Sequence, residues 1–394
     1  MFARTLRCCG AAGTVALAAM LFGCQAAPSG PADPQASIGE PVLQYQVVDL
    51  GTLGGTSSFA ADVNGRSQIV GGSSTADGLT HAFLWQEGVM TDLGTLGGNT
   101  SEATEINENG QVVGRSADAA GETHAFLWTD GVMQDLGPVA AFSAVRINAR
   151  GQVAWTSWTT GEPRRAFLWT DGVTQELGTL GDTGWAGARA LNDRGQVVGE
   201  SNSRPFLWEN GIMRELPGLG GGGWASAINN RGQVVGASYE PVPGDPYGSI
   251  LNAVLWDGDQ TVRLGKLSED THSEGGLINQ AGMVVAHSYP FSWYPPRSFL
   301  WTAGTVTRFT TVYNYYKASD LNEPGVVVGE QRAAFGSQRA VVWELGESTQ
   351  LPLLDGRLSG AIAVNNAGTV VGWATTSTND KHGVLWQKSL VALQ

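Results

Sequence analysis

Short apolar runs, separated by Gly, Asn and Asp, follow one another along most of the chain. The stretch THAFLWTDGVMQDLG at 123–137 shows the unit: an aromatic and aliphatic run, an Asp-Gly pair, and a second short run. This order predicts a β-hairpin closed by a two-residue turn. No segment carries a clear apolar repeat of about 3.6 residues, so we predict almost no helix.

The hairpin belongs to a unit that recurs eight times. Its tryptophan marks each copy, and 301 residues separate the first from the last, a mean interval of 43 residues. These tryptophans are Trp85, Trp128, Trp169, Trp208, Trp256, Trp301, Trp343 and Trp386. A second landmark, an Asn that follows an apolar residue and precedes a turn, also occurs eight times. It consists of Asn64, Asn107, Asn148, Asn192, Asn229, Asn279, Asn322 and Asn365.

Each copy predicts four short strands, which in the second copy are SEATEIN, GQVVGRS, HAFLWT and VMQDLG. A period of about 40–50 residues with four strands per unit is typical of a β-propeller. We therefore predict an all-β fold: a single β-propeller over residues 42–394, with eight four-stranded blades of about 43 residues. A single blade has apolar faces and unpaired edges, so neighbouring blades and closure of the ring must stabilise it.

Two positions of the repeat predict how the blades pack. The residue four places before each landmark Asn is always small, for example Ala60 and Gly275. Small side chains suit the first strand, where the blades converge on the axis. The tryptophans fall on the third strand, where a large ring fills the wider wedge. The landmark Asn residues are expected to form Asx turns.

Closure of the ring involves both ends of the repeat region. The segments 45–51 and 388–393 both resemble fourth strands, so the chain has nine such segments for eight blades. We expect one of them to complete the last blade and the other to add at its edge, and the sequence does not decide between them.

The first residues predict export. Residues 1–23 have Arg4 and Arg7 before a mostly apolar run, as in a secretory signal peptide. LFGC at 21–24 resembles the bacterial lipobox, which makes Cys24 the predicted lipidation site; an ordinary cleavage site with a stray Cys nearby is the alternative. Residues 24–41 then form the lipidated Cys and a disordered tether. Gln25 favours the outer membrane, with the propeller periplasmic or surface-exposed.

Charge and cysteine content narrow the partners. The formal net charge is −13, or −15 without the signal peptide, and no cluster of Lys and Arg occurs. This acidity argues against nucleic acid and against docking on anionic lipid, so we expect contact with a membrane through the lipid anchor only. Cys8 and Cys9 leave with the signal peptide, so we expect no disulfide and no thiolate metal site. We expect a monomer without cofactors.

The motifs of the first two copies resemble the bacterial extracellular HAF repeat family, which is named for a His-Ala-Phe string. They are DLGTLGG at 49–55 and 92–98, INENGQVVG at 106–114, and HAFLW at 81–85 and 124–128. The match covers nearly all of residues 45–393 but weakens in copies five to eight, where the string becomes Asn252-Ala253-Val254 or Arg339-Ala340-Val341. The resemblance implies export and a repeat architecture, and it implies no established activity.

The sequence shows no evident catalytic or metal site. It has no Gly-x-Ser-x-Gly and no His-Glu-x-x-His string. The GTLGG strings lack the following helix of a phosphate cradle and are expected to be turns. Arg or Asn replaces the His of His-Ala-Phe in five copies, so we expect a structural polar residue there. Asp62, Glu105 and Asp320 share one inner-strand position, but other copies carry Arg, Ala or Leu, so an acidic ring is not expected.

The copies differ mainly in the loops that emerge on one face of a propeller, between second and third strands and between blades. In copies three to seven these loops hold aromatic residues that the repeat does not require. The predicted ligand-binding residues are Trp158, Trp185, Trp224, Tyr247, Trp293, Tyr294, Tyr313, Tyr315 and Tyr316. Exposed rings suit protein or glycan partners, whereas rings that fold inward would only cap the blades.

We therefore predict an exported envelope lipoprotein whose β-propeller is a binding or scaffolding module for protein or glycan, through this aromatic-rich loop face. The alternative is a polysaccharide-acting enzyme, a hydrolase or lyase, with acidic loop residues of copies five to seven on the same face. A pair of carboxylates about 5–10 Å apart beside the rings would favour the enzyme. Scattered polar groups would favour binding.

Overall fold

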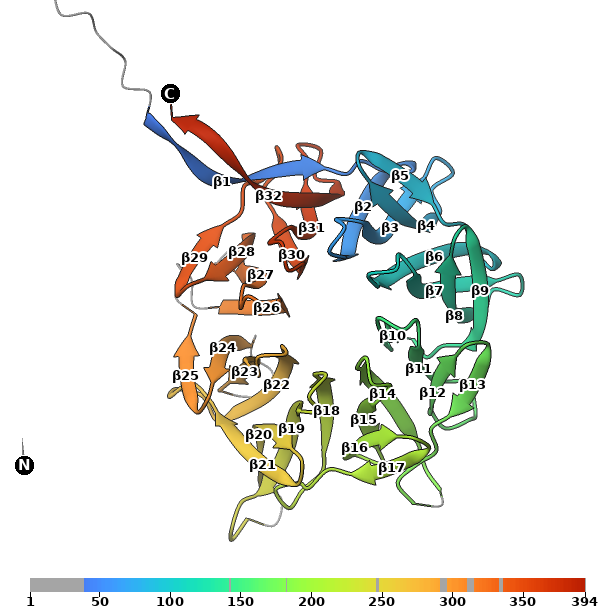
Figure 1. Ribbon diagram of the computed structural model, residues 1–394, viewed down its shortest axis with the longest axis vertical. Coiled ribbons are helices and arrows are strands. Elements are labelled where there is room, and N and C mark those ends of the chain that lie inside the picture. The colour runs from blue at the N-terminus through green and yellow to red at the C-terminus, as the bar shows by residue number, and fades with distance from the viewer. Residues whose placement is uncertain are drawn as a thin grey trace, which may run out of the picture. The chain divides into compact units, whose positions relative to one another are not determined.

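The structure is a computed structural model that describes residues 39–141, 143–181, 183–245, 248–290, 296–309, 315–332 and 336–393. Val42–Val391 form one compact unit. The unit Val42–Val391 is the predicted β-propeller: eight four-stranded antiparallel sheets are arranged as blades around a common axis (Figure 1). All regular elements of the described residues are strands.

Blades one to four take their strands in chain order. They are β2 (Gly54–Val63), β3 (Ile69–Thr75), β4 (Thr80–Gln86) and β5 (Val89–Asp92); β6 (Gly97–Ile106), β7 (Val112–Asp118), β8 (Thr123–Thr129) and β9 (Val132–Pro138); β10 (Val145–Ile147), β11 (Val153–Ser157), β12 (Arg165–Thr170) and β13 (Val173–Glu176); β14 (Ala186–Leu191), β15 (Val197–Ser201), β16 (Arg204–Glu209) and β17 (Ile212–Glu215).

Blades five to seven continue in the same way, and blade eight combines both ends of the repeat region. They are β18 (Gly223–Ile228), β19 (Val234–Pro241), β20 (Ser249–Asp257) and β21 (Gln260–Gly265); β22 (His272–Ile278), β23 (Val284–Tyr289), β24 (Arg297–Thr302) and β25 (Thr305–Arg308); β26 (Tyr315–Leu321), β27 (Val327–Arg332), β28 (Gln338–Glu344) and β29 (Glu347–Gln350); β30 (Ser359–Val364), β31 (Val370–Thr375) and β32 (Lys381–Leu393) with β1 (Gly39–Asp49).

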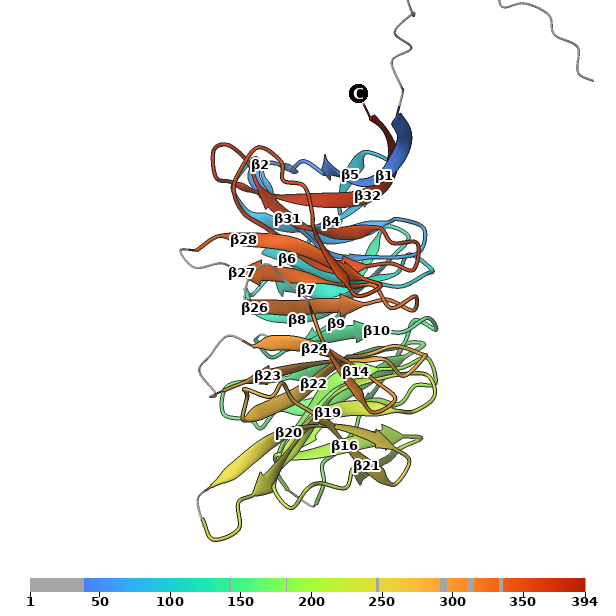
Figure 2. The ribbon, with the colours of Figure 1, turned by 90° about the vertical axis from the view of Figure 1, so that its left-hand side faces the viewer.

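The first strand of each blade lies nearest the axis and the fourth lies at the rim (Figure 1). The strands cross the thickness of the ring, so connections emerge on two faces (Figure 2). We call the face with the connections from second to third strands the loop face. The opposite face, with the Asn turns and the hairpin turns, is the turn face. β19 and β20 extend furthest on the loop face, at the lower left of Figure 2.

The first and second strands approach so closely that they need small residues. Ala60 is fully buried and pairs with Gly71. A Cβ atom on Gly71 would lie 2.0 Å from the carbonyl oxygen of Phe59. Ala103 pairs with Gly114 in the same way. The small position predicted from the repeat is therefore confirmed as a packing requirement.

The first strand carries a β-bulge just beyond the small residue in seven of the eight blades. In blade four the pairing passes from Ala188 to Ala190, which leaves Arg189 unpaired on the bulge. A bulge changes the direction in which a side chain points and increases the local twist. The bulge therefore sets the orientation of the side chains around the axis.

The hydrophobic core lies between neighbouring blades. One cluster joins Val70 of blade one to Ile106 and Phe126 of blade two. Six of the eight landmark tryptophans are buried, while Trp128 and Trp169 are partly buried against such clusters. The core role predicted for the tryptophans is confirmed.

The eight landmark asparagines form a closed ring of hydrogen bonds. Each Oδ1 atom accepts from the backbone N–H four residues later. In six of the eight copies it also accepts from the N–H two residues later, which confirms the predicted Asx turn in those blades. Each Nδ2 atom also donates to the backbone carbonyl oxygen of the next blade's asparagine, at 2.9–3.2 Å. Asn365 of blade eight completes this asparagine ring by donating to Asn64 of blade one. All eight side chains are buried.

Blade eight is closed by the N-terminal strand. Its order is β1-β32-β31-β30, so β1 is the fourth strand. The expectation that the other terminal segment adds at the edge is wrong, because residues 388–393 continue β32. In blade two, Asp130 and Gly131 both have positive φ and end the third strand in a tight turn. Lys388 and Ser389 occupy the equivalent positions after the blade-eight tryptophan, and without a glycine the strand runs on.

Candidate binding face

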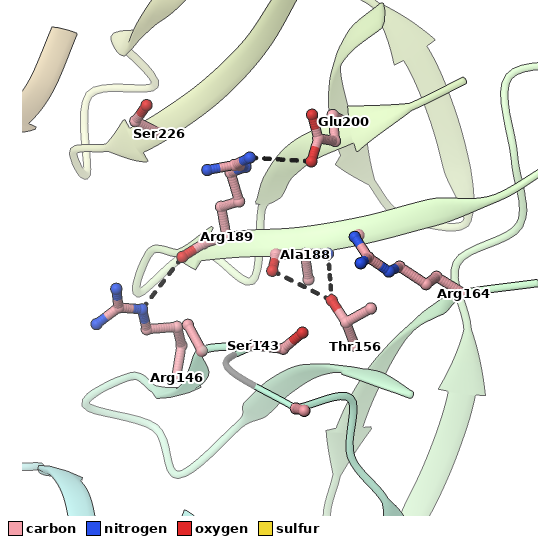
Figure 3. Close-up of a pocket in the computed structure, with 11 residues that line it drawn as sticks. Ser143, Arg146, Thr156, Arg164, Ala188, Arg189, Glu200 and Ser226 are labelled. Atoms are coloured by element: carbon pink, nitrogen blue, oxygen red, sulfur yellow. Dashed lines mark hydrogen bonds and ion pairs between the residues drawn. The ribbon is translucent and has the colours of Figure 1, made fainter. Parts of the chain in front are cut away.

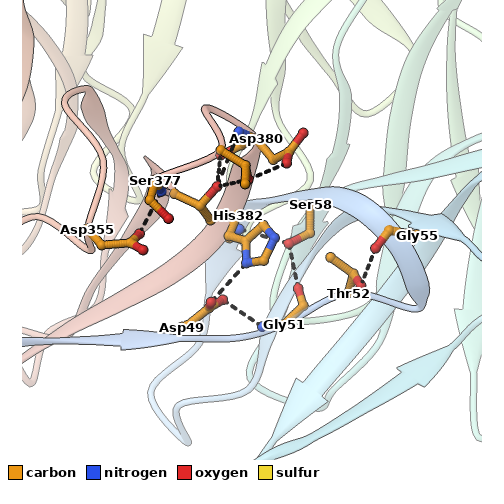
Figure 4. A network of polar contacts seen from close by, with 12 residues as sticks. Asp49, Gly51, Thr52, Gly55, Ser58, Asp355, Ser377, Asp380 and His382 are labelled. Atoms are coloured by element: carbon orange, nitrogen blue, oxygen red, sulfur yellow. Dashed lines mark hydrogen bonds and ion pairs between the residues drawn. The ribbon is translucent and has the colours of Figure 1, made fainter.

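The His position of the third strand and the Asp of Asp-Leu-Gly are joined by a side-chain contact within one blade, shown for blade eight, where the string reads His-Gly-Val (Figure 4). His382 Nδ1 lies 2.8 Å from Asp49 Oδ2, and Asp49 Oδ1 accepts a hydrogen bond from the Gly51 N–H at 2.8 Å. The His therefore holds the rim strand, which is the structural role expected from the sequence. The contact recurs as His81 with Asp92, His124 with Asp135 and, as an ion pair, Arg204 with Glu215.

The GTLGG strings are turns, as expected. Thr52 Oγ1 donates to the Gly55 carbonyl oxygen at 2.8 Å (Figure 4). The Leu53 N–H donates to Ser73 Oγ at the same distance. Within the described residues, no group of three or more His, Cys, Asp or Glu side chains is placed to hold a metal ion.

Three carboxylates near the axis connect neighbouring blades. Asp62 Oδ2 accepts from the backbone N–H of Ile106 in the next blade at 2.9 Å, and Glu105 and Asp320 make equivalent bonds. Burial, and then the charge of Glu105, raises the pKa of Asp62 to about 7. Burial also raises the pKa of Glu105 and of Asp320. Because each carboxylate accepts a backbone hydrogen bond from the next blade, these acids serve the fold.

A second polar group lies in blades six and seven. Glu274 on β22 is paired in register with His287 on β23. His287 Nδ1 lies 2.8 Å from Ser298 Oγ. Burial, and then the charge of Lys317, lowers the pKa of His287 to about 4, so its ring is neutral at pH 7. Burial raises the pKa of Glu274.

A cavity of about 410 Å³ lies along the inner strands of blades three to five; we call it the arginine cavity (Figure 3). Three arginines line it: Arg146 on β10, Arg164 just before β12, and Arg189 on the bulge of β14. In the view of Figure 3, Ala188 lies between Arg146 and Arg164. Glu200 is the one acid among the lining residues. Hydroxyl groups come from Ser143, Thr156 and Ser226.

Two of these arginines have partners but stay open to solvent. Arg146 Nε donates to the Arg189 carbonyl oxygen at 3.1 Å, and its Nη1 is 3.8 Å from Glu105 Oε1. Arg189 Nη2 donates to Glu200 Oε1 at 2.9 Å. The Arg189 guanidinium also lies 5.7 Å from the centre of the Trp224 ring, within cation–π range. The Arg146 and Arg189 side chains are 46% and 44% exposed.

A cavity of about 460 Å³ lies on the loop face between blades two and three; we call it the tryptophan cavity. Ala141 lines both cavities. Trp158, which is 48% exposed, lines the tryptophan cavity. Glu122 is the one acid among its lining residues, and hydroxyl groups come from Thr123, Thr159 and Thr160. Aromatic and polar groups thus lie beside the cluster of guanidinium groups.

The described members of the predicted aromatic set have different environments. Trp158 lines the tryptophan cavity, and Trp185 is partly buried. Trp224 is partly buried and packs edge-to-face on Tyr239, with ring centres 6.3 Å apart. Tyr316 is only 3% exposed and belongs to the core between blades six and seven. It lies two residues before the buried Ala318, so strand alternation turns its ring inward.

The other predicted site residues are not described. Tyr315 lies in β26, but its side chain is outside the description. The lipidation site Cys24 lies outside the described residues, and so do four of the aromatics. These are Tyr247, Trp293, Tyr294 and Tyr313.

Sequence reasoning did not single out Arg164 and Arg189. The signal for Arg189 is a departure from the repeat, because the bulge position holds Ala61 in blade one and Ser226 in blade five. Finding it requires the bulge, which the alternation of apolar and polar residues does not reveal. Arg164 directly precedes the His position of its copy, where blades one and two have Thr80 and Thr123.

Comparison with known proteins supports the fold. No protein-family model matches the sequence, and no curated protein sequence matches it. A structure from a study of two prolyl endopeptidases has a TM-score of 0.54 at 13% identity, over 82% of this chain but only 55% of that chain. The β-propeller domain of the Trilobed protease from Pyrococcus furiosus has a TM-score of 0.49 at 13% identity, over 74% of this chain and 95% of that one.

A third structure, TolB from Acinetobacter baumannii, has a TM-score of 0.35 at 12% identity, over 74% of this chain and 80% of that chain. In the part of the chain that the structure describes, no helix has the length and apolar character to cross a membrane. At such low identities a shared fold does not carry an activity with it. The resemblance to the HAF repeat family stays a prediction, and the chain is an eight-bladed β-propeller of repeated units.

Proposed function

We propose that this β-propeller is a binding module whose loop face takes a glycan. The observation that carries the proposal is Trp158, which is 48% exposed and lines a cavity of about 460 Å³. Small-ligand sites commonly have volumes of about 300–1,000 Å³. The flat indole ring offers an apolar face for a sugar ring, and the neighbouring threonines offer hydroxyl groups for hydrogen bonds.

Glycan fits this face better than protein. A protein partner needs a continuous patch that is richer in apolar and aromatic residues than its surroundings. The large apolar residues with the greatest exposure are instead spread singly over several blades of the described chain. They include Val89, Val132, Val173 and Ile212, each the first or second residue after a hairpin turn.

The residues that line the cavities also favour glycan binding over glycan cleavage. Glycoside hydrolysis generally uses two carboxylates that flank the scissile bond. Among the described lining residues, each cavity has a single acid: Glu200 in the arginine cavity and Glu122 in the tryptophan cavity. Incubation of the protein with bound oligosaccharides is therefore expected to release no new reducing ends and no unsaturated products.

The proposal places the module at the bacterial cell envelope. Residues 1–23 would direct export, and a lipid on Cys24 would anchor the chain through the tether up to residue 41. Gln25 favours the outer membrane as the site of anchoring, and the resemblance to the HAF repeat family also supports export. A formal net charge of −13 supports a membrane contact through the lipid alone.

The Trp158→Ala variant tests the glycan site. The native chain is screened against envelope and cell-wall polysaccharides, and each bound glycan is then measured by titration calorimetry. Loss of the stacking ring is expected to weaken binding by about ten-fold or more. Val173→Ala, in the same blade and outside both cavities, is the matched control and should bind like the native chain. Equal affinity in the native and Trp158→Ala proteins, with equal melting temperatures, would place the function elsewhere.

A further inference from the structure

We propose that the arginine cavity binds the carboxylate of an acidic sugar, so that the glycan taken by the loop face is a polyuronate. The inference rests on the proposed function and adds the chemical class of the ligand. Three observations carry it: the unneutralised charge of the cavity, the departure of its arginines from the repeat, and its position beside Trp158.

The arginine cavity holds more positive charge than its described lining neutralises. Three guanidinium groups face one lining carboxylate, and that carboxylate, Glu200, is paired with Arg189. The nearest acid to Arg146 is Glu105, at 3.8 Å. Arg164 is exposed, and its guanidinium has no hydrogen-bond or ion-pair partner among the described residues. A ligand carboxylate can therefore approach Arg146 and Arg164 without displacing an existing strong ion pair.

The packing of a blade does not explain these arginines. The position of Arg189 on the bulge is occupied by Ala61 in blade one and by Ser226 in blade five. The position of Arg146 is occupied by Ala190 in blade four. Blades with these small residues have the same four strands. Arg189 thus belongs to the cavity and not to the repeat, whereas Arg146 both lines the cavity and links blade three to blade four through the Arg189 carbonyl oxygen.

The charge of the whole chain makes a local interaction necessary. The chain is acidic, with a formal net charge of −13, so its overall field does not attract an anionic polymer. Attraction must come from short contacts in the arginine cavity. The planar guanidinium group suits a carboxylate because both oxygens can be bound at once.

The arrangement favours an acidic sugar over an acidic peptide. Ala141 lines both cavities, so a short chain can span them, with a ring on Trp158 and a carboxylate near Arg164. The hydroxyl groups of Ser143 and Ser226 match the hydroxyl groups of a sugar. An acidic peptide would use the arginines but has no regular apolar face for the tryptophan.

The experiment compares a charged oligosaccharide with its neutral form. Tetragalacturonate and its methyl ester have the same backbone, and only the first carries carboxylates. Titration calorimetry with the native chain is expected to show at least about ten-fold tighter binding of the acid, because charge-assisted hydrogen bonds are the stronger kind. The difference should shrink when the salt concentration is raised from about 50 mM to about 300 mM.

Two variants identify the cavity. Arg164 has no partner to lose, so Arg164→Gln is expected to fold normally and to bind tetragalacturonate about ten-fold more weakly, with the methyl ester unchanged. Arg150→Gln removes the same charge from the Asn turn on the turn face, and both ligands should bind it as they bind the native chain. Melting temperatures show whether each variant is folded.

The outcomes separate this inference from the proposed function. Equal affinity for the acid and the ester, lost in Trp158→Ala, would overturn the uronate inference and leave the glycan site standing. Acid binding that needs Arg164 but not Trp158 would support the inference and overturn the stacking site. Hexaglutamate that binds through Arg164 as tightly as tetragalacturonate would assign the cavity to acidic peptides. Failure of both tetragalacturonate and tetramannuronate to bind would overturn the inference outright.

Discussion

The side-chain amide of each landmark asparagine makes two kinds of hydrogen bond. An Asx turn needs only an acceptor, which Asp also provides. The link to the next blade needs a donor as well, and the amide supplies both on one short side chain. All eight copies carry Asn and none carries Asp, which is the sequence signal for the asparagine ring. A prediction of a turn alone accounts for the Oδ1 acceptor of the amide but not for its Nδ2 donor.

The Asn148→Asp substitution tests the asparagine ring. Asn148 Nδ2 donates to Gln152 Oε1 at 2.8 Å and to the Asn192 carbonyl oxygen at 2.9 Å. A carboxylate oxygen would face both acceptors in a buried site, so we expect a loss of about 2–4 kcal/mol in the free energy of unfolding. Urea denaturation measures it. Asn366→Asp is the control, because the exposed Asn366 accepts a bond and no donor contact of its amide is known in the described structure.

The candidate site is less predictable from sequence than the fold, for reasons that differ between residues. Trp158 is predictable because it lies in a loop and is not required by the repeat. Tyr316 is misleading, since the repeat does not require an aromatic residue there, yet it belongs to a strand and its side chain is buried. Arg146 and Arg189 come together only because two blades are adjacent and one first strand is bulged. Spacing along the chain does not contain that proximity.

Hairpin turns are the elements that best show how local sequence sets local structure. In blades one to four the first turn residue has φ near +50° and is Glu, Asp or Asn, followed by Gly. In blade seven that residue is Leu345, which has φ +53° and is 96% exposed. A leucine in the left-handed region is strained and here gains nothing from burial. The turn forms nevertheless, so the strands on either side impose it.

Leu345→Asn is expected to stabilise the protein by about 0.5–1 kcal/mol, because Asn tolerates the left-handed conformation better. Urea denaturation of the two proteins checks this. The reverse change at the equivalent turn of blade four, Asn210→Leu, should destabilise by a similar amount. Identical stability of all three proteins would show that the turn residue does not limit hairpin formation.

The strands were predictable because two periods coincide, the alternation within a strand and the spacing of 43 residues between copies. The closure of the last blade was less predictable from the sequence. Both terminal segments have a fourth-strand pattern, and pattern alone cannot rank them. The decisive detail is local: at the positions where blade two has Asp130 and Gly131, the chain has Lys388 and Ser389 after Trp386, so the third strand continues.

At the scale of the whole molecule, the carboxylates around the axis make stability depend on pH. The pKa of Asp62 is raised from 3.8 to about 7, and the pKa values of Glu105 and Asp320 are also raised. The folded state thus binds protons more readily than the unfolded state between about pH 4 and pH 7. By linkage, the contribution of these three carboxylates to the free energy of unfolding rises as the pH falls through this window and is smallest above it.

Urea denaturation at pH 8 and pH 6 is therefore expected to give greater stability at pH 6. Asp62→Asn removes the main titrating group, so its stability should change less between the two pH values. Asp62 accepts hydrogen bonds from two backbone N–H groups, and the single oxygen of an Asn side chain would lose one of them. The Asn variant is therefore expected to be less stable at every pH, so the change in stability with pH is the quantity to compare. The same pH response in both proteins would show that another group is responsible.

The contact between His382 and Asp49 joins residues that are 333 positions apart. A ribosome completes Asp49 long before His382, so β1 has no sheet to join while the residues between them are being made. Seven blades can assemble in order as they appear, whereas the eighth must wait for both ends. Of the described strands, β1 is therefore the first to be synthesised and among the last to find its place.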